Sequence, residues 1–347
     1  MITTKPVCVT GASGFIAAYI VRDLLKKGYR VRGTVRKSPK NYPFLLNLPG
    51  AAENLELVEA ELLREGAYDR AVEGCEYVIH TASPYKINVK NPQHDLVDPA
   101  VNGTESVLQS CLKSGGIKRV VYTSSIAAIT DEPDNSKVFS EKDWNTMSSL
   151  ERNPYHYSKT LAEQAAWEFI MKKKPAFDLV VINPFMVVGP SLSPSLNTSN
   201  QVIRDIMVGV YPGIMDLTWG FVDVRDVAKA HLLALENSAA SGRYLCSNTP
   251  MHMRELVALL KSSGFTGYAL PKVNLTGKAG TLLMKVLSYT QPKNTGVYIR
   301  TNIGRIMRFD NTKIRRELGI AFMDVNKSII ETVDDMIQWK HLPPPKR

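Results

Sequence analysis

The segment that most restricts the fold of this chain lies in its first 20 residues. Val7–Thr10 is a short apolar run typical of a buried strand, and the pattern Gly11-x-x-Gly14-x-x-Ala17 follows it directly, with apolar residues at helical spacing beyond. Gly11 permits a tight turn, Gly14 lets backbone N–H groups approach a phosphate, and Ala17 allows close packing of helix on strand. The segment therefore predicts a strand–turn–helix unit that binds a dinucleotide.

Strand-like and helix-like segments alternate through the first 185 residues. After the first unit, strands are expected at residues 29–35, 55–58, 77–80, 119–123 and 179–182, and helices at 14–27, 66–73, 93–114 and 155–173. This alternation is typical of a parallel sheet covered by helices on both faces. We therefore expect an α/β fold with a doubly wound parallel sheet of the Rossmann type.

The composition of the sequence changes after Asn183-Pro184. Residues 189–200 are rich in Ser, Pro and Asn and predict a long functional loop, whereas 224–238 predict a helix that returns to the sheet. Short helices are expected at 251–261, 311–317 and 325–339 among irregular stretches. We expect residues 1–188, with 219–240 returning to them, to form a dinucleotide-binding domain, and residues 189–218 and 241–347 to form a smaller, mixed α/β substrate-binding domain.

The residues after the second expected strand indicate which dinucleotide is bound. Enzymes that prefer NAD usually carry an Asp or Glu there, which binds the ribose 2′-hydroxyl. Residues 34–40 contain no acid but three bases, Arg36, Lys37 and Lys40. Because a guanidinium can form paired, charge-assisted hydrogen bonds with a 2′-phosphate, we predict NADP, with a merely solvated basic loop as the alternative.

Tyr155 and Lys159 are four residues apart in a helical segment, so their side chains project from one face. An ammonium group beside a phenol stabilises the phenolate, which suits the phenol to proton transfer near neutral pH. This spacing alone is common by chance. It gains meaning from Ser125, which follows a strand at the same sheet edge and can donate to a carbonyl oxygen that becomes anionic as hydride arrives.

His80 ends an apolar strand and is followed by Thr81, Ala82, Ser83 and Pro84. Small residues at the carboxyl end of a parallel strand leave room for a dinucleotide to lie across the sheet. His80 could act as an acid or base there, but its apolar strand favours a hydrogen-bonded core side chain.

Composition and charge exclude several other classes of function. No apolar run is long enough for a membrane-spanning helix, no signal peptide is recognisable, and the four scattered cysteines lack metal-site spacing. We expect a cytoplasmic protein with buried cysteines, no metal and no integral membrane segment. Residues 1–250 carry 27 Lys/Arg and 26 Asp/Glu, while 251–347 carry 16 and 7. This basic C-terminal quarter predicts a solvated surface, with an anionic substrate tail or a membrane face as alternatives, and no motif indicates nucleic-acid binding.

With these residues in place, the chain resembles the extended short-chain dehydrogenase/reductases. Within them it is similar to the group of dihydroflavonol 4-reductase, cinnamoyl-CoA reductase and the yeast-type methylglyoxal/aldehyde reductases. The similarity covers about residues 5–250, in the stretches Val9–Ala17, Val31–Arg36, His80–Pro84, Pro99–Gly103, Thr123–Ser125, Tyr155–Trp167, Asn183–Pro184, Val188–Pro190 and Phe221–Asp226.

The resemblance implies a catalytic set of Ser125, Tyr155 and Lys159, with Asn102 in a supporting hydrogen-bond network. It also implies a cofactor site made from the glycine turn, the strand ends and the loop after Pro184, namely Gly11, Ser13, Gly14, Phe15, Ile16, Arg36, Lys40, Glu61, Leu62, Thr81, Ala82, Ser83, Thr123, Tyr155, Lys159, Pro184 and Val187.

The chain departs from the pattern of these relatives at three places and, in addition, in the length of one segment. Glu61 replaces the Asp usual near the adenine, and Thr130 stands where flavonoid reductases carry Asn or Asp, which argues against a dihydroflavonol substrate. His156-Tyr157 departs from the cysteine-containing signature of plant cinnamoyl-CoA reductases. The segment 273–308 is longer than in the plant enzymes, and we expect it to cover the substrate cleft.

The leading prediction is an NADPH-dependent reductase of an aldehyde or ketone, reversible, acting on a small-molecule carbonyl substrate as a monomer or homodimer. A nucleotide-sugar epimerase or dehydratase is one alternative, because such enzymes share the fold and the Tyr/Lys pair. They hold NAD tightly, usually through the acid that this chain lacks. A non-catalytic dinucleotide sensor is a further alternative, although such proteins tend to lose the Tyr/Lys pair.

Overall fold

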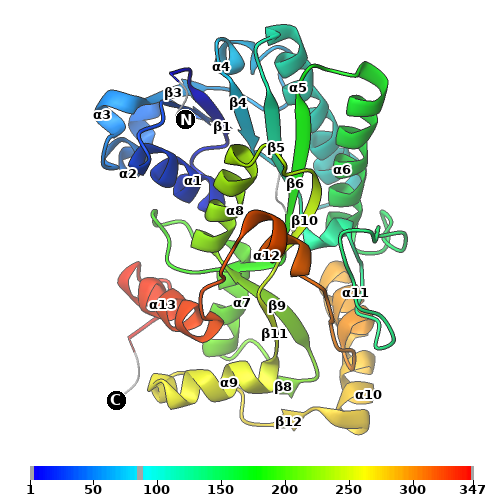
Figure 1. The fold of residues 1–347 in the computed structure, drawn as a ribbon. Helices are drawn as coiled ribbons and strands as arrows, with labels where there is room; N and C mark the ends of the chain where they lie inside the picture. The colour runs from blue at the N-terminus through cyan, green and yellow to red at the C-terminus, as the bar shows by residue number, and fades with distance from the viewer. Residues whose placement is uncertain (1–3, 84–88, 345–347) are drawn as a thin grey trace.

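The computed structural model describes residues 4–83 and 89–344 and arranges them in two lobes (Figure 1). The first lobe contains a seven-stranded sheet in the order β10-β6-β5-β4-β1-β2-β3, in which every neighbouring pair is parallel. Its strands are β1 Val7–Thr10, β2 Val31–Val35, β3 Leu55–Glu59, β4 Tyr77–His80, β5 Arg119–Thr123, β6 Asp178–Pro184 and β10 Gly242–Cys246. The strand order reverses between β1 and β4, so a ligand crevice is expected at their carboxyl ends. The predicted doubly wound sheet is confirmed.

Helices cover both faces of this sheet, which explains why its central strands are apolar on both sides. One face carries α1 (Phe15–Lys26), α8 (Val224–Glu236) and α12 (Thr312–Leu318), whose apolar residues share one core with β1 and β2. The other face carries α4 (Asp69–Val72), α5 (Asp98–Ser114) and α6 (Pro154–Lys173). All four cysteines are buried, as expected.

The second lobe occupies the lower half of Figure 1 and has a core of its own. Its strands form a three-stranded sheet, β11-β9-β7, and a two-stranded pair, β12-β8, with bounds β7 Met186–Val188, β8 Ile214–Met215, β9 Thr218–Asp223, β11 Thr249–His252 and β12 Asn274–Leu275. Its helices are α7 Thr198–Met207, α9 Met253–Ser262, α10 Gly277–Leu287, α11 Lys293–Asn302 and α13 Val325–Gln338. None of the helices in the described part of the chain is long and apolar enough to cross a membrane.

Several expected elements have different bounds in the structure. The loop expected at 189–200 ends early, because α7 begins at Thr198 and the Asn197 side chain caps it by accepting from the Asn200 N–H at 2.9 Å. Residues 251–252 belong to β11 rather than to the helix expected from residue 251. The helix expected at 66–73 is a single turn, α4. Strands of two to six residues, such as β8 and β9, are too short to show a clear periodicity in the sequence.

Two strands cross the expected domain boundaries. β10 lies within 241–347 but pairs with β6 at the edge of the large sheet. β9 lies mostly within 219–240 but pairs with β7 and β11 in the second lobe. α8 follows β9 directly and packs against α1, which is the return to the sheet expected for this segment. We still propose a division into cofactor and substrate domains. In this division the chain returns to the cofactor domain at the start of α8.

Candidate active site

The glycine turn after β1 is held in place by β2 and β4. Gly11 adopts a left-handed φ of +65°, and a Cβ there would lie 3.1 Å from Cα of Ala82. The Gly11 N–H donates to Oγ1 of Thr34 at 2.9 Å, and the Ala12 N–H donates to the Thr34 carbonyl at 2.8 Å. A residue with a side chain would therefore strain the turn and press on β4.

Helix α1 begins at Phe15, directly after this turn, and no side chain caps its first N–H groups. Uncapped N–H groups and the positive end of the helix dipole favour an anion. Gly14 is exposed at this position, and Ser13, Phe15 and Ile16 are partly exposed beside it. The turn is therefore suited to a pyrophosphate.

The end of β4 is tied to the glycine turn through Thr10. Its hydroxyl accepts from the N–H groups of Thr81 and Ala82, both at 3.1 Å, and shares a 2.7 Å hydrogen bond with Nδ1 of His80. His80 is fully buried, and burial lowers its pKa to about 3. His80 is thus a neutral, hydrogen-bonded core residue, as predicted. Pro84 lies outside the described residues.

Ser125 follows β5 and starts a single helical turn, η3 (Ile126–Ala128). Its Oγ accepts from the Ala127 N–H at 3.2 Å, which leaves its own hydrogen free to be donated. Its carbonyl accepts from Nδ2 of Asn183 on β6 at 3.1 Å. The hydroxyl of the neighbouring Thr123 is instead paired with Nε2 of His231 at 2.7 Å, within the core.

Tyr155 and Lys159 lie in the first two turns of α6. Nζ of Lys159 lies 6.0 Å from the centre of the Tyr155 ring and donates to Oγ of Ser83 at 2.9 Å. Lys159 is buried, and burial lowers its pKa to about 8, while the carboxylate of Glu163 one turn later acts in the opposite direction. The Lys159–Ser83 bond joins α6 to the end of β4, as a site at the carboxyl edge of the sheet requires.

A fully buried carboxylate lies beneath this pair. Oε2 of Glu163 accepts from Oγ of Ser124 at 2.5 Å and from Nδ2 of Asn183 at 2.7 Å. Oε1 accepts from Nε of Arg243 on β10 at 2.5 Å. Glu163 therefore joins α6 to β5, β6 and β10, next to Ser125 and Lys159. This network was not predicted from the sequence, although the position of Glu163 one turn after Lys159 was a usable signal.

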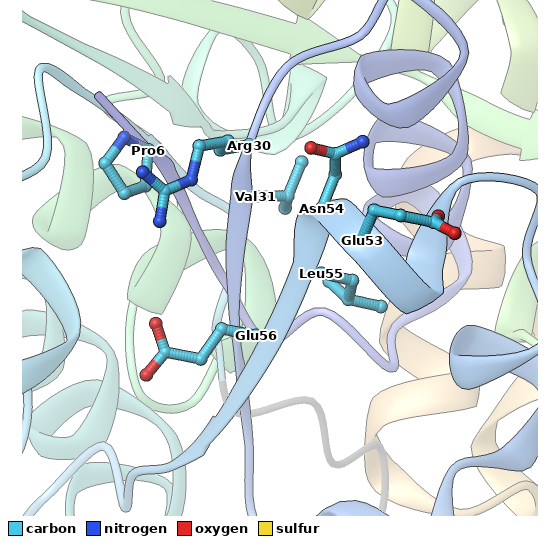
Figure 2. A pocket seen from close by; sticks show the side chains of 7 residues that line it. All are labelled: Pro6, Arg30, Val31, Glu53, Asn54, Leu55 and Glu56. Atoms are coloured by element: carbon cyan, nitrogen blue, oxygen red, sulfur yellow. The ribbon is translucent and has the colours of Figure 1, made fainter. Parts of the chain in front are cut away.

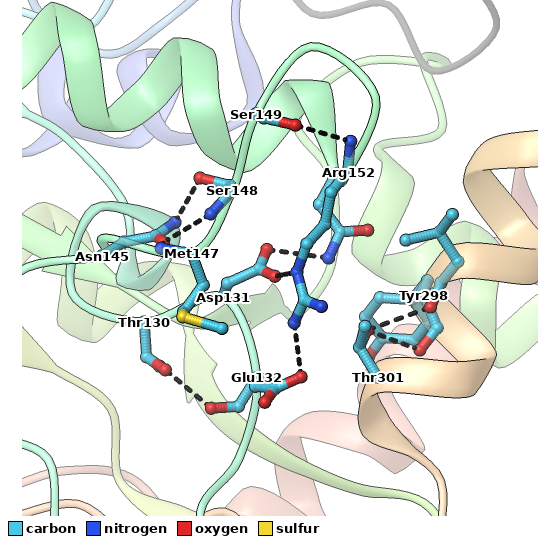
Figure 3. A network of polar contacts seen from close by, with 12 residues as sticks. Thr130, Asp131, Glu132, Asn145, Met147, Ser148, Ser149, Arg152, Tyr298 and Thr301 are labelled. Carbon is cyan, nitrogen blue, oxygen red and sulfur yellow. Dashed lines mark hydrogen bonds and ion pairs between the residues drawn. The ribbon is translucent and has the colours of Figure 1, made fainter.

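The start of α6 is fixed by a second polar network, and Figure 3 shows its members Asp131, Glu132 and Arg152. Asn153, directly before α6, has a left-handed φ of +51°, which is uncommon for a residue other than glycine. The buried Asp131 carboxylate accepts from Nδ2 of Asn153 and from Nε of Arg152, both at 2.7 Å. Glu132 pairs with Arg152 and also with Arg305, which follows α11. These contacts set the position at which Tyr155 enters the site.

The expected 2′-phosphate and adenine residues are on the surface. Arg36 and Lys40 are exposed after β2, and neither side chain makes a hydrogen bond or ion pair with another residue in 4–83 or 89–344. Glu61 is exposed, whereas Leu62 packs on α5, where a Cβ at Gly103 would lie 2.5 Å from its Cγ.

The other predicted site residues lie at different depths. Asn102 is exposed on α5 and makes no hydrogen bond with the side chains of the catalytic set within the described ranges. Pro184, at the end of β6, and Val187, on β7, are buried. The structure therefore brings Ser125, Lys159 and Tyr155 to one sheet edge without linking Asn102 to them.

A small hollow of about 100 Å³ lies on the side of the sheet where the strands begin, away from their carboxyl ends (Figure 2). It is lined by Pro6, Arg30, Val31, Glu53, Asn54, Leu55 and Glu56. These residues lie at the amino ends of β1, β2 and β3, and the carboxyl ends of these parallel strands all lie on the other side of the sheet. The hollow is therefore separate from the candidate active site.

The sequence of this chain is similar to a known protein family and to several named reductases. Residues 7–246 match the family described as the NAD dependent epimerase/dehydratase family. The chain is 47% identical over 262 residues to cinnamoyl-CoA reductase CAD2 of Medicago truncatula, covering 74% of this chain and 79% of that protein. It is 38% identical to cinnamoyl-CoA reductase 1 of Petunia hybrida, over 99% and 96% of the two chains.

Among solved structures, the fold is similar to yeast methylglyoxal/isovaleraldehyde reductase Gre2 complexed with NADPH. The TM-score is 0.80 at 29% identity, with 97% of this chain and 99% of that chain covered. The resemblance inferred from the motifs is confirmed, and it extends beyond residue 250, where the sequence patterns were weak.

Loss of the Glu163 charge should destabilise the protein strongly. Glu163→Gln keeps the size of the side chain but leaves the guanidinium of Arg243 buried without its partner charge, so we expect a loss of about 3 kcal/mol in the free energy of unfolding, measured by denaturant titration. Glu168→Gln is the matched control, because Glu168 lies on the same helix and makes only an exposed pair with Lys172. Its effect should stay below about 0.5 kcal/mol. Equal effects of the two variants would contradict the assigned role of Glu163.

Buried histidines should make stability depend on pH. Burial lowers the pKa of His80 to about 3 and that of His231 to about 4, so the unfolded chain takes up these protons as pH falls below about 6.5 and the folded chain does not. Stability should therefore be lost from pH 6.5 towards 4, at up to about 1.4 kcal/mol per pH unit for each histidine. His231→Asn should reduce that slope when unfolding is measured across this range, and an unchanged slope would count against the assignment.

Proposed function

Because the chain belongs to the extended short-chain dehydrogenase/reductases, within the NAD dependent epimerase/dehydratase family, we propose that it is an NADPH-dependent reductase of an aldehyde or ketone. The observation that carries this proposal is the Lys159–Ser83 contact, which places the Tyr155/Lys159 face of α6 at the carboxyl end of β4. The Ser125 strand end lies at the same edge of the sheet. The glycine turn, the Ser83 hydroxyl and Ser125 thus follow the carboxyl ends of the neighbouring parallel strands β1, β4 and β5, which supports the proposal.

The residues present fit NADP. The uncapped start of α1 and the close approach of Gly11 to Ala82 leave a backbone cradle of the kind that takes a pyrophosphate. In residues 36–40, directly after β2, the exposed charges are all positive, and Arg36 is the side chain that would bind the 2′-phosphate, with Lys40 nearby in the sequence. The related reductase solved with NADPH supports this choice of cofactor.

The chain's own residues divide the remaining work in the reaction. When bound, the reduced cofactor supplies the hydride to the carbonyl carbon. Tyr155 gives its proton to the carbonyl oxygen, and Ser125 donates a hydrogen bond to that oxygen as its negative charge grows. The Lys159 ammonium, positioned by Ser83, stabilises the phenolate that remains. The product is the alcohol, and the same groups serve the reverse reaction.

The sequence disfavours one class of reaction that this fold supports, but it leaves several classes of carbonyl substrate to test. An epimerase or dehydratase that holds NAD is disfavoured, because no acid follows β2. Several relatives are named cinnamoyl-CoA reductases, although His156-Tyr157 departs from the cysteine-containing signature expected of plant members. Aromatic aldehydes, aliphatic ketones, acyl-CoA thioesters and hydroxysteroids are therefore the compounds for an NADPH-oxidation screen.

Removal of the Tyr155 hydroxyl should stop the chemistry without stopping cofactor binding. Tyr155→Phe keeps the ring but removes the proton, so turnover should fall by about 10³-fold or more, while NADPH affinity, measured by fluorescence titration, should stay near that of the wild type. Preserved turnover in this variant would refute the mechanism.

Charge reversal after β2 should change cofactor preference. Arg36→Glu should weaken NADPH by roughly tenfold or more and NADH much less, because only NADPH carries the 2′-phosphate. Arg30→Glu is the matched control, since Arg30 is exposed at the amino end of the same strand. The ratio of the two dissociation constants is the measurement, and a ratio unaffected by Arg36→Glu would exclude this residue from the site.

A further inference from the structure

The helix α10 presents an apolar face to solvent. Its outward residues Leu282, Leu283, Val286 and Leu287 are 65%, 48%, 59% and 40% exposed, and we call these four the α10 apolar face. They recur at the spacing of a single helix face. Large exposed apolar patches on soluble folds mark sites of interaction with another surface.

The opposite side of α10 is already packed in the second lobe. Met284 is buried, and a Cβ at Gly280 would lie 2.2 Å from the carbonyl oxygen of Leu275 on β12. The helix rests on β8, β12 and α11, at the lower right of Figure 1. The apolar face is therefore not needed for packing of the described lobe.

The segment that carries this face has charges of one sign, although one of its bases, Arg305, is paired with Glu132. Residues 256–309 contain no Asp or Glu, and they contain eight bases: Lys261, Lys272, Lys278, Lys285, Lys293, Arg300, Arg305 and Arg308. Lys278 and Lys285 are two turns apart on α10 and border the apolar face on one flank. Tyr289, just beyond α10, is 76% exposed, and the Arg300 guanidinium lies 4.2 Å above its ring.

We propose that the α10 apolar face docks this protein on an anionic lipid membrane surface. An amphipathic helix with leucines on one side and lysines on its flank lies in the plane of such a surface, with the apolar side among the acyl chains. Bases near an anionic leaflet are attracted to its surface charge. The stacked Tyr289 and Arg300 pair suits the headgroup layer, where an apolar body and a polar end are both accommodated.

The charge pattern argues against a second copy of the chain as the occupant. Symmetric pairing through this face would bring two base-rich, acid-free segments together, with no carboxylate from residues 256–309 to compensate. A lipid surface carries the complementary charge. The α10 apolar face lies on the second lobe, whereas the carboxyl edge of the large sheet lies on the first. The inference is therefore independent of the proposed reaction.

Vesicle co-sedimentation of the full chain tests this proposal. The wild-type protein should pellet at low salt with vesicles of phosphatidylcholine containing about 30% phosphatidylserine, and stay in solution with phosphatidylcholine alone. Val286→Glu should weaken pelleting by roughly tenfold, because it places a charge within the apolar face. Met171→Glu is the matched control: Met171 is 66% exposed on α6, before Lys172 and Lys173, and the substitution changes net charge equally. Its binding should stay as in the wild type.

Several outcomes would overturn the proposal. Failure of the wild type to pellet with the anionic vesicles would do so directly. An equal loss in both variants would show that net charge alone drives binding. If analytical ultracentrifugation without vesicles showed a dimer for the wild type and a monomer for Val286→Glu, the face would be assigned to self-association. NADPH oxidation by each variant in vesicle-free buffer, together with its circular dichroism, verifies that the folded state is retained.

Discussion

The Glu163 carboxylate is the interaction on which the geometry of the active site depends. It is fully buried, and a buried charge is tolerated only when its hydrogen-bonding capacity is filled. Its partners are Ser124, Asn183 and Arg243, which come from the ends of β5 and β6 and from the edge strand β10. Helix α6 therefore cannot slide on the sheet without leaving a charge unpaired. This constraint holds the first turns of α6 against the Ser125 strand end.

A second set of contacts couples this helix to the other lobe. Asp131 fixes the left-handed Asn153 before α6, and Glu132 links Arg152 to Arg305, beyond α11. The second lobe is thus joined by ion pairs to the start of the helix that carries Tyr155. These pairs tie the position of Tyr155 to the second lobe as well as to the large sheet.

The sequence predicted those parts of the molecule whose signals are local. The strand, turn and helix around Gly11, and the Tyr155/Lys159 pair, are short patterns whose physics is contained within about 20 residues. β7, β9 and β11 were missed, because three to six residues that pair across long chain separations show little periodicity of their own.

Contacts between distant residues were hidden for a similar reason. Glu163 and Arg243 are 80 positions apart, and only the parallel pairing of β10 with β6 brings them together. Asn102 was assigned to the catalytic network by resemblance, whereas the structure exposes it on α5. Arg36 directly follows β2, as expected, because both the strand and the basic residues after it can be recognised in the local sequence.

Direct hydride transfer to a carbonyl carbon, at the sheet edge that carries Ser125, Tyr155 and Lys159, is the central step of the proposed reaction. Its most direct test uses NADPH deuterated at either face of nicotinamide C4, with an aldehyde or ketone found in the screen and mass spectrometry of the alcohol. We expect one of the two deuterated cofactors to give an alcohol carrying a single deuterium on the former carbonyl carbon, with the other giving none. Turnover without deuterium in the product from either cofactor, or without net oxidation of NADPH, would contradict the account.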